Sequence, residues 1–239
     1  MIHFQQVTKR YGDRPVVDGV DLSIREGEFF VLVGPSGSGK TTLLKMINGL
    51  IERTEGEILI QNRPIGSYPL RELRLDVGYV LQQIALFPNL TVCENITLIP
   101  EMKGWPREQR LKKARELLEK VGLDPKVYMK RKPRDLSGGE QQRVGILRAI
   151  IAGPKILLMD EPFSALDPLA REQLQDLVLD LHRELKMTMV FVTHDLNEAL
   201  KLGDRIGVLR GGKLIQVDSP ENIVENPENA FISDFFQGR

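Results

Sequence analysis

The sequence predicts an α/β fold in which buried strands alternate with helices, and three apolar runs support this prediction. Residues 29–33 form the first run, and a glycine-rich loop and a helical pattern from Leu43 follow it. Residues 156–161 and 189–193 are two further runs of strand length, each ending in polar residues. Continuous apolar runs of this length, separated by helices, are typical of the parallel sheet of an α/β protein.

The glycine-rich loop is the most informative segment. Residues 34–42 fit the pattern G-x-x-x-x-G-K-[ST] in full, and they lie between a strand and a helix, as this motif requires. In such loops successive backbone N–H groups point at phosphate oxygens, the lysine reaches the β- and γ-phosphates, and the hydroxyl ligates Mg²⁺. A plain Gly/Ser surface turn is the weaker interpretation. The residues expected to bind a nucleoside triphosphate are Gly34, Pro35, Ser36, Gly37, Ser38, Gly39, Lys40, Thr41 and Thr42.

The composition limits the classes of protein to consider. Lys and Arg number 33, as do Asp and Glu, so the net charge is zero, whereas a dedicated nucleic-acid binder usually carries a basic excess. No apolar run approaches the roughly 20 residues that span a bilayer, and no basic-then-apolar leader predicts secretion. The single cysteine, Cys93, excludes an internal disulfide framework and fits a reducing cytosol.

The other strands are expected at residues 2–7, 20–24, 57–60, 77–81, 205–209 and 213–217. Gly49 is a plausible stop for the helix after the phosphate loop, and Gly211 with Gly212 joins the last two strands. The tail from 220 to 236 predicts short helices.

Residues 101–135 have a different character, with twelve Lys or Arg against six Asp or Glu. Pro106 marks a possible helix start, and apolar residues follow at helical spacing from Leu111 to Val121. The segment is therefore expected to be a helical insertion with a basic outer face. A solvated face explains these charges most simply; the alternative is a contact with anionic lipid or with an acidic loop of a partner.

A long helix is expected to begin at Ser137 and to reach about Ala152. Ser137 and Glu140 have the spacing of a capping box. Capping does not explain Gly138 and Gly139, because two glycines in a first turn cost about 1–2 kcal/mol relative to alanine. They are understandable if a second anion must approach the bare backbone there.

Two carboxylates end the run 156–161. Buried strands that end in acids are uncommon unless a cation or a proton is involved, although two exposed turn acids are possible. Asp160 is expected to be a Mg²⁺ partner. Glu161, on the other side of the strand, is expected to orient and deprotonate the attacking water.

Two helix starts and one histidine complete the pattern. Asp167 and Pro168 are typical of an N-cap followed by proline. His194 ends the run 189–193, where parallel sheets place ligand-contacting groups, and Asp195 with Glu198 has the spacing of another box-like helix start.

The order of these motifs resembles the ATP-binding subunit of ABC transporters over essentially the whole chain. The hallmark segment of that family is similar to Leu136, Ser137, Gly138, Gly139, Glu140 and Gln141. The resemblance implies a P-loop NTPase with a RecA-like core, an N-terminal antiparallel β subdomain and an inserted α-helical subdomain. The core would comprise residues 1–87 and 136–239 of a single ABC ATPase domain, and the helical subdomain residues 88–135.

The resemblance also implies roles for single residues. Tyr11, otherwise explained as a strand-end aromatic over the core, corresponds to the ring that stacks on adenine. Gln82, preferred over Gln83 because Q-x-x-A-L-F-P aligns from it, corresponds to the residue that contacts Mg²⁺ and water and senses the membrane partner. Glu161 would be the catalytic glutamate, and His194 would contact the γ-phosphate. The inter-subunit loop is similar to Ser164, Ala165, Leu166 and Asp167.

The implied partners are a second copy of the chain and a membrane permease. Two copies would pack head to tail with each ATP, and its Mg²⁺, between the phosphate loop of one copy and residues 136–141 of the other. The helical segment and the Gln82 loop would contact the permease on the cytoplasmic side of the membrane. An extracytoplasmic substrate-binding protein would act indirectly, and no nucleic acid is expected.

A finer resemblance comes from residues 78–88, 98–106, 190–195 and 198–202. These segments look like those of bacterial importers for glycine betaine, carnitine or choline, whose relatives include importers of ergothioneine. Several members carry paired regulatory domains after the ATPase, and these are not among the 239 residues. The alternatives are an exporter motor and a soluble ABC ATPase of DNA repair or translation. The latter usually has long coiled coils or two ATPase units.

Overall fold

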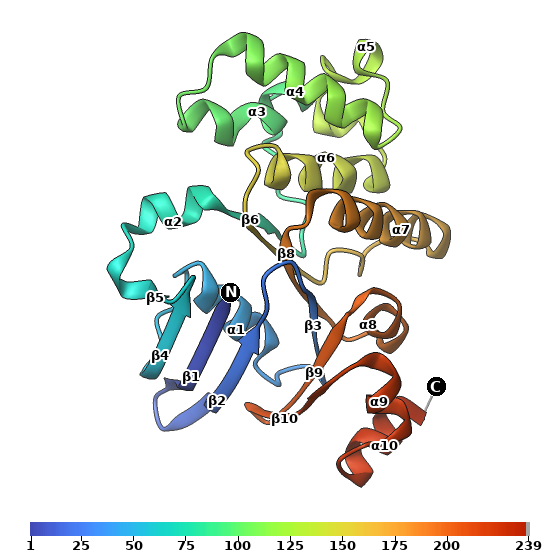
Figure 1. Ribbon diagram of the computed structural model, residues 1–239. Helices are drawn as coiled ribbons and strands as arrows, with labels where there is room; N and C mark the ends of the chain where they lie inside the picture. Colours follow the sequence, from blue (N-terminus) through green and yellow to red (C-terminus); the bar gives the residue numbers. More distant parts are fainter. Residues whose placement is uncertain (238–239) are drawn as a thin grey trace. The chain divides into compact units, whose positions relative to one another are not determined.

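The computed structural model describes residues 1–237 (Figure 1). The chain divides into two compact units, one made of Met1–Arg74 with Glu184–Arg239 and one of Leu75–Arg183. The second unit contains the expected helical segment 88–135 together with residues 75–87 and 136–183. The division into a core and a helical subdomain at residues 88 and 135 stays a prediction.

The first unit contains an antiparallel sheet in the order β2-β1-β4-β5 (Figure 1). Its strands are β1 (Ile2–Tyr11), β2 (Arg14–Ile24), β4 (Glu55–Ile60) and β5 (Arg63–Pro64). Strand β1 is longer than the expected 2–7 because irregular pairing with β2 beyond Phe4 keeps it in the sheet as far as Tyr11. Ile2, Phe4 and Val7 are buried on its inner face.

The same unit contains strands in the order β10-β9-β3-β8. Strand β3 (Phe29–Val33) lies parallel to β8 (Thr188–Thr193) and β9 (Arg205–Arg210), while β10 (Lys213–Asp218) is antiparallel to β9. Every residue of β3 and β8 is buried, which explains their continuous apolar sequences. The helices are α1 (Lys40–Ile47), α8 (Leu196–Leu202), α9 (Pro220–Glu225) and α10 (Ala230–Gln237), with a 3₁₀ turn at Ile65–Ser67.

The second unit has two parallel strands, β6 (Val77–Val80) and β7 (Ile156–Asp160). Its helices are α3 (Val92–Met102), α4 (Arg107–Lys120), α5 (Pro125–Tyr128) and α6 (Gly138–Ile150), with a 3₁₀ turn at Pro133–Asp135. Helix α3 packs against α4 and α6 (Figure 1). Helices α2 (Leu70–Asp76) and α7 (Pro168–Leu185) run across the unit boundaries.

Glycine, aspartate and proline at characteristic positions in the sequence correctly indicate several helix ends. Gly49 ends α1 with φ +66°, and Asp167 caps α7 by accepting from Ala170 N at 3.0 Å. Pro106, the expected start, is the N-cap of α4, so the helix itself begins one position later, at Arg107. The sequence did not predict α3, whose interior holds Pro100. Within residues 1–237, no helix combines the length and the apolar character needed to cross a membrane.

Candidate functional site

The phosphate loop (residues 34–42) has a backbone that only glycine can adopt at two positions. Gly34 has φ +154°, and a Cβ there would lie 2.1 Å from the Leu209 carbonyl oxygen. Gly39 has φ +104°, and its Cβ would lie 2.5 Å from the Val16 carbonyl oxygen. These backbone contacts cannot give way, so both glycines are required to shape the loop.

Lys40 lies at the centre of this loop and is buried. Its Nζ donates to the carbonyl oxygens of Gly34 at 2.7 Å and Pro35 at 3.0 Å, so the loop curls around the ammonium group. Ser38 Oγ is buried and has no hydrogen-bond partner among the described residues. An ammonium group held inside a glycine loop beside an unpartnered hydroxyl fits a phosphate group. Pro35, Ser36 and Gly37 form the exposed crest, and Thr41 and Thr42 lie half-buried in the first turn of α1.

His194 lies at the same edge of the sheet as the phosphate loop. Because Val33 pairs with Thr193 in parallel register, Gly34 and His194 both directly follow the carboxyl ends of neighbouring strands. His194 is exposed. The sequence predicts a capping box formed by Asp195 and Glu198, and the structure agrees only in part. Asp195 caps α8, but the Glu198 carboxylate accepts a hydrogen bond from Thr193 Oγ1 at 2.6 Å.

Tyr11 ends β1 at the hairpin with β2, where it pairs with Arg14. Its side chain is 55% exposed, so it does not cover the core, and the simple packing explanation is wrong. Lys9 Nζ lies 5.0 Å from the ring centroid. The ring therefore presents an accessible aromatic surface in the same unit as the phosphate loop.

Gln82 and the two acidic residues lie together in the second unit. Val80 pairs with Met159 in parallel register, so Gln82 and Glu161 follow neighbouring strand ends. Gln82 Nε2 donates to Glu161 Oε2 at 3.4 Å. Asp160 is buried, and the Tyr79 hydroxyl lies 3.5 Å from Asp160 Oδ2. Burial and the charge of Asp160 raise the pKa of Tyr79 well above its usual value, which keeps its hydroxyl protonated as a donor.

Glu161 departs from the conformation that the sequence predicts. Strand β7 ends at Asp160, and Glu161 has φ +43° instead of projecting from the strand. This left-handed conformation is strained for a residue with a side chain, particularly before a proline. A turn fixes it, because Ser164 N at 3.3 Å and Ser164 Oγ at 3.0 Å both donate to the Glu161 carbonyl oxygen.

The capping box at the start of α6 is confirmed. Glu140 N donates to Ser137 Oγ at 3.3 Å, and Ser137 N donates to Glu140 Oε2 at 2.7 Å. The Tyr128 hydroxyl also donates to Glu140, and this hydrogen bond holds the pKa of the Glu140 carboxyl below its usual range. Leu136 is buried, and its carbonyl accepts from Gln141 Nε2 at 3.1 Å.

The chain's own packing does not require the two glycines that follow Ser137. A Cβ on Gly138 would lie 3.9 Å from Leu166 Cδ2, and one on Gly139 would lie 3.7 Å from Ala170 Cβ, both ordinary contacts. A hollow of about 490 Å³ lies beside them. It is lined in part by Ser137, Gly138, Gly139, Glu140, Ala165, Leu166 and Asp167.

The family is decided by comparison with known proteins. The family model described as "ABC transporter" matches residues 17–164, which is more than half of the chain. The chain belongs to the ABC transporter family. The resemblance found in the sequence and the α/β cassette fold with its antiparallel sheet are thus confirmed.

Two curated relatives of this ABC protein are named as ATP-binding proteins of transport systems. The glycine betaine/carnitine/choline transport ATP-binding protein OpuCA of Bacillus subtilis is 50% identical over 98% of this chain and 62% of its own length. The osmoprotectant import ATP-binding protein OsmV of Salmonella typhimurium is 47% identical over 98% of this chain and 63% of its own. The chain thus spans about three-fifths of the length of these relatives.

Among solved structures, the ATP-binding cassette MJ0796 in a dimeric post-hydrolysis state bound to ADP and Pi is similar to this chain. The TM-score is 0.82 at 38% identity, and the match covers 92% of this chain and 99% of the cassette.

Two features of these sites could not be found from the sequence. Tyr79 and Asp160 are 81 residues apart in the sequence. The hydrogen bonds from Ser164 to the Glu161 carbonyl span only three residues, but they belong to a turn that no periodic pattern marks. A tyrosine in a strand is usually packing, and only the pairing of β6 with β7 brings its hydroxyl to a carboxylate.

Proposed function

We propose that this chain is the ATP-hydrolysing motor subunit of an ABC importer, in which two copies bind ATP between them and hydrolyse it to drive uptake of a small solute. The observation that carries the proposal is the glycine-only loop closed around Lys40 in a chain of this family. The other residues at the strand ends supply the groups that hydrolysis requires.

The phosphate loop and Tyr11, both in the first unit, would bind the phosphates and the base of the nucleotide. Lys40 would exchange its two carbonyl partners for phosphate oxygens, and Ser38 Oγ would gain a partner. The exposed ring of Tyr11 would stack on adenine. Mg²⁺ would be held by Thr41, Gln82 and Asp160, and when bound it would neutralise part of the phosphate charge.

Hydrolysis would depend on Glu161, Gln82 and His194. The Glu161 carboxylate would accept a proton from the attacking water, and the Gln82 amide beside it would help to orient that water. His194, exposed at the end of β8, would contact the γ-phosphate and stabilise its developing charge. The turn around the Glu161 carbonyl fixes the backbone from which the carboxylate projects, so less reorganisation would be needed during the reaction.

The second copy would supply residues 136–141. Gly138 and Gly139 have space for a Cβ within this chain, so packing inside the chain does not account for them, whereas a group that approaches from outside would. A γ-phosphate bound by the other copy suits the first turn of α6, where backbone N–H groups and the helix dipole favour an anion. Residues 164–167 line the same hollow and would lie at the interface between the copies. The dimeric state of the similar cassette MJ0796 supports this arrangement.

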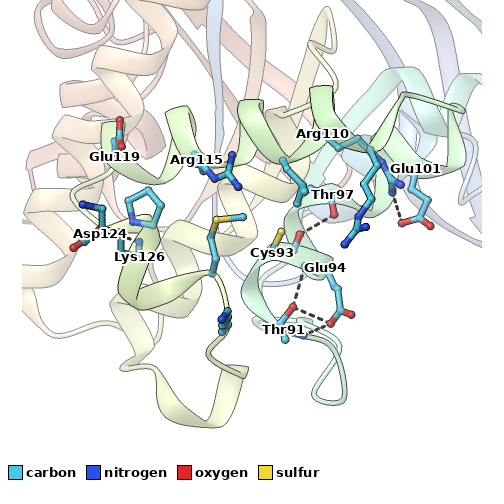
Figure 2. A pocket seen from close by; sticks show the side chains of 15 residues that line it. Thr91, Cys93, Glu94, Thr97, Glu101, Arg110, Arg115, Glu119, Asp124 and Lys126 are labelled. Carbon is cyan, nitrogen blue, oxygen red and sulfur yellow. Dashed lines mark hydrogen bonds and ion pairs between the residues drawn. The ribbon is translucent and has the colours of Figure 1, made fainter.

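The permease would contact the second unit at a basic hollow of about 840 Å³ formed by α3, α4 and α5 (Figure 2). The acids on its wall are mostly engaged: Glu94 belongs to the cap of α3, Asp124 caps α5, and Glu101 pairs with Arg110. Four cations on the wall have no side-chain hydrogen bond or ion pair among the described residues; they are Arg107, Arg115, Lys126 and Lys130. A cytoplasmic loop with acidic side chains would therefore complement this hollow.

The solute would be a quaternary amine or a related betaine. Two curated relatives are named for glycine betaine, carnitine, choline and osmoprotectants. Ergothioneine is a chemically related betaine. The chain would act on the cytoplasmic side of the cell membrane as a peripheral subunit, and an extracytoplasmic binding protein would select the solute.

Purified chain with MgATP tests the enzymatic part of the proposal. We expect phosphate release by the wild type and loss of it in Lys40→Ala, because the phosphates lose their ammonium partner. Near-normal hydrolysis by Lys40→Ala would overturn the assignment of the loop. ATP turnover that rises with DNA or ribosomes, and not with a permease, would favour a soluble ABC ATPase instead.

Affinity capture of the permease tests the docking surface. Arg115→Glu should weaken capture by reversing a charge on the wall of the basic hollow. Lys112→Glu is the matched control, because Lys112 is an exposed cation on the same helix that does not line the hollow. Equal capture by both variants would contradict this docking surface.

A further inference from the structure

Arg148, in the last turn of α6, makes contacts that its place in the fold does not require. Its Nη1 donates to the Ala85 carbonyl oxygen at 2.6 Å, and its guanidinium carbon lies 6.0 Å from the Phe87 ring centroid. No ion pair to a carboxylate joins it among the described residues. Burial lowers the pKa of this guanidinium.

The partly buried guanidinium of Arg148 lowers the stability of the fold, so stability alone does not explain its contacts. A partly buried charge without an opposite charge loses hydration that one carbonyl and one ring face replace only in part. The end of a helix favours a cation, but a lysine would meet that demand equally well. The contact with Ala85 therefore needs another explanation.

Ala85 belongs to the Gln82 loop (residues 81–88), which joins β6 to α3. Asn95, fully buried, holds the far end of this loop: its Oδ1 accepts from Phe87 N at 2.8 Å, and its Nδ2 donates to the Phe87 carbonyl at 3.1 Å. Strand β6 holds the near end at Val80. Arg148 contacts the middle of the loop, three residues after Gln82, whose side chain is exposed and touches Glu161.

We propose that Arg148 is a positioning residue that fixes the Gln82 loop so that the Gln82 amide stays beside the Glu161 carboxylate. Helix α6 begins with residues 138–140, which are proposed to meet the nucleotide bound by the second copy. The hydrogen bond from Arg148 to Ala85 therefore connects this helix to the loop that carries Gln82. A shift of α6 would then move Ala85 and change the Gln82–Glu161 contact. This inference rests on the proposed function, in which Gln82 and Glu161 act on water.

A double-mutant cycle on the full chain tests this role. Arg148→Lys keeps the charge and removes the guanidinium contact with Ala85, and we expect kcat for ATP hydrolysis to fall about tenfold, the effect of one charge-assisted hydrogen bond. The KM for ATP should change less than about twofold, because the phosphate loop is unaltered. In a Gln82→Ala background, Arg148→Lys should cause no further loss, because it acts through Gln82.

Arg143→Lys is the matched control. Arg143 lies on the same helix and its Nη1 donates to the Val121 carbonyl at the same distance, 2.6 Å, away from the Gln82 loop. Any loss of kcat caused by Arg143→Lys should multiply with the loss of kcat caused by Gln82→Ala. If the effects of Arg148→Lys and Gln82→Ala multiply as well, Arg148 has only a structural role and the proposal is wrong.

Hydrogen exchange gives a readout that does not depend on turnover. Amides of residues 82–87 should exchange faster in Arg148→Lys than in Arg143→Lys. Phe87→Leu, which removes a half-exposed ring from the guanidinium, should produce a smaller increase. Unchanged exchange in Arg148→Lys would overturn the inference, whereas absence of ATP hydrolysis by the wild type would overturn the proposed function alone.

Discussion

Replacing Gly139 by alanine should stabilise the isolated chain and abolish its ATP-dependent pairing. Gly139 lies in the first turn of α6, has no positive φ, and has only Ala170 Cβ at 3.7 Å from the position of an added Cβ. Alanine in a helix is favoured over glycine by about 0.5–1 kcal/mol, and nothing in this chain offsets that gain. Pairing should fail because the added methyl group keeps the second copy's γ-phosphate from the backbone N–H groups.

The two effects can be measured separately. Urea unfolding followed by Trp105 fluorescence gives the free energy of unfolding, and size-exclusion chromatography with ATP gives the pairing. Gly145→Ala is the matched control, because Gly145 is in the same helix and an added Cβ meets no atom within 4 Å. It should stabilise the chain to a similar degree and leave pairing intact. Destabilisation by Gly139→Ala, or pairing equal to that of Gly145→Ala, would refute the reasoning.

Three further outcomes follow from the geometry. Tyr11→Ala should weaken ATP affinity by about 1–3 kcal/mol through lost stacking, and an unchanged Kd in a nucleotide titration would remove the ring from the site. Glu161→Gln should bind ATP without releasing phosphate, so continued phosphate release would exclude its role as the base. The Tyr128 hydroxyl lowers the pKa of Glu140, so the resulting stability is present above the ordinary carboxyl pKa and lost as the pH falls through the lowered value. Unfolding measured from about pH 6 to about pH 3 should show a smaller pH dependence in Glu140→Gln, and equal slopes would contradict this.

Features encoded by neighbouring residues were predictable from the sequence. The phosphate loop, the capping box of Ser137 and Glu140, and the N-cap at Asp167 each depend on residues within a few positions of one another. The continuous apolar sequences of β3, β7 and β8 were recognisable because both faces of these strands are buried. Local chemistry therefore located most of the strand and helix ends.

Features that depend on distant contacts, or on local geometry with no recognisable sequence pattern, were not predictable. The left-handed conformation of Glu161 is held by Ser164, and no pattern distinguishes it from a continued strand. Helix α3 was missed because proline usually breaks a helix, yet Pro100 lies buried near its end. The contact of Arg148 with Ala85 joins residues 63 positions apart, and in the sequence Arg148 is one more cation on a helix.

Mixing two inactive variants tests the central claim most directly. Lys40→Ala disables the phosphate loop, and Gly139→Asp places a negative charge in the first turn of α6, so each variant alone should be inactive. If ATP is bound between the phosphate loop of one copy and the first turn of α6 of the other, a mixed pair keeps one intact site. Equal mixing should then restore about a quarter of the wild-type ATP turnover, because half of the random pairs are mixed and each has one intact site of two. No recovery on mixing two folded variants that still pair with wild-type chain would contradict the account.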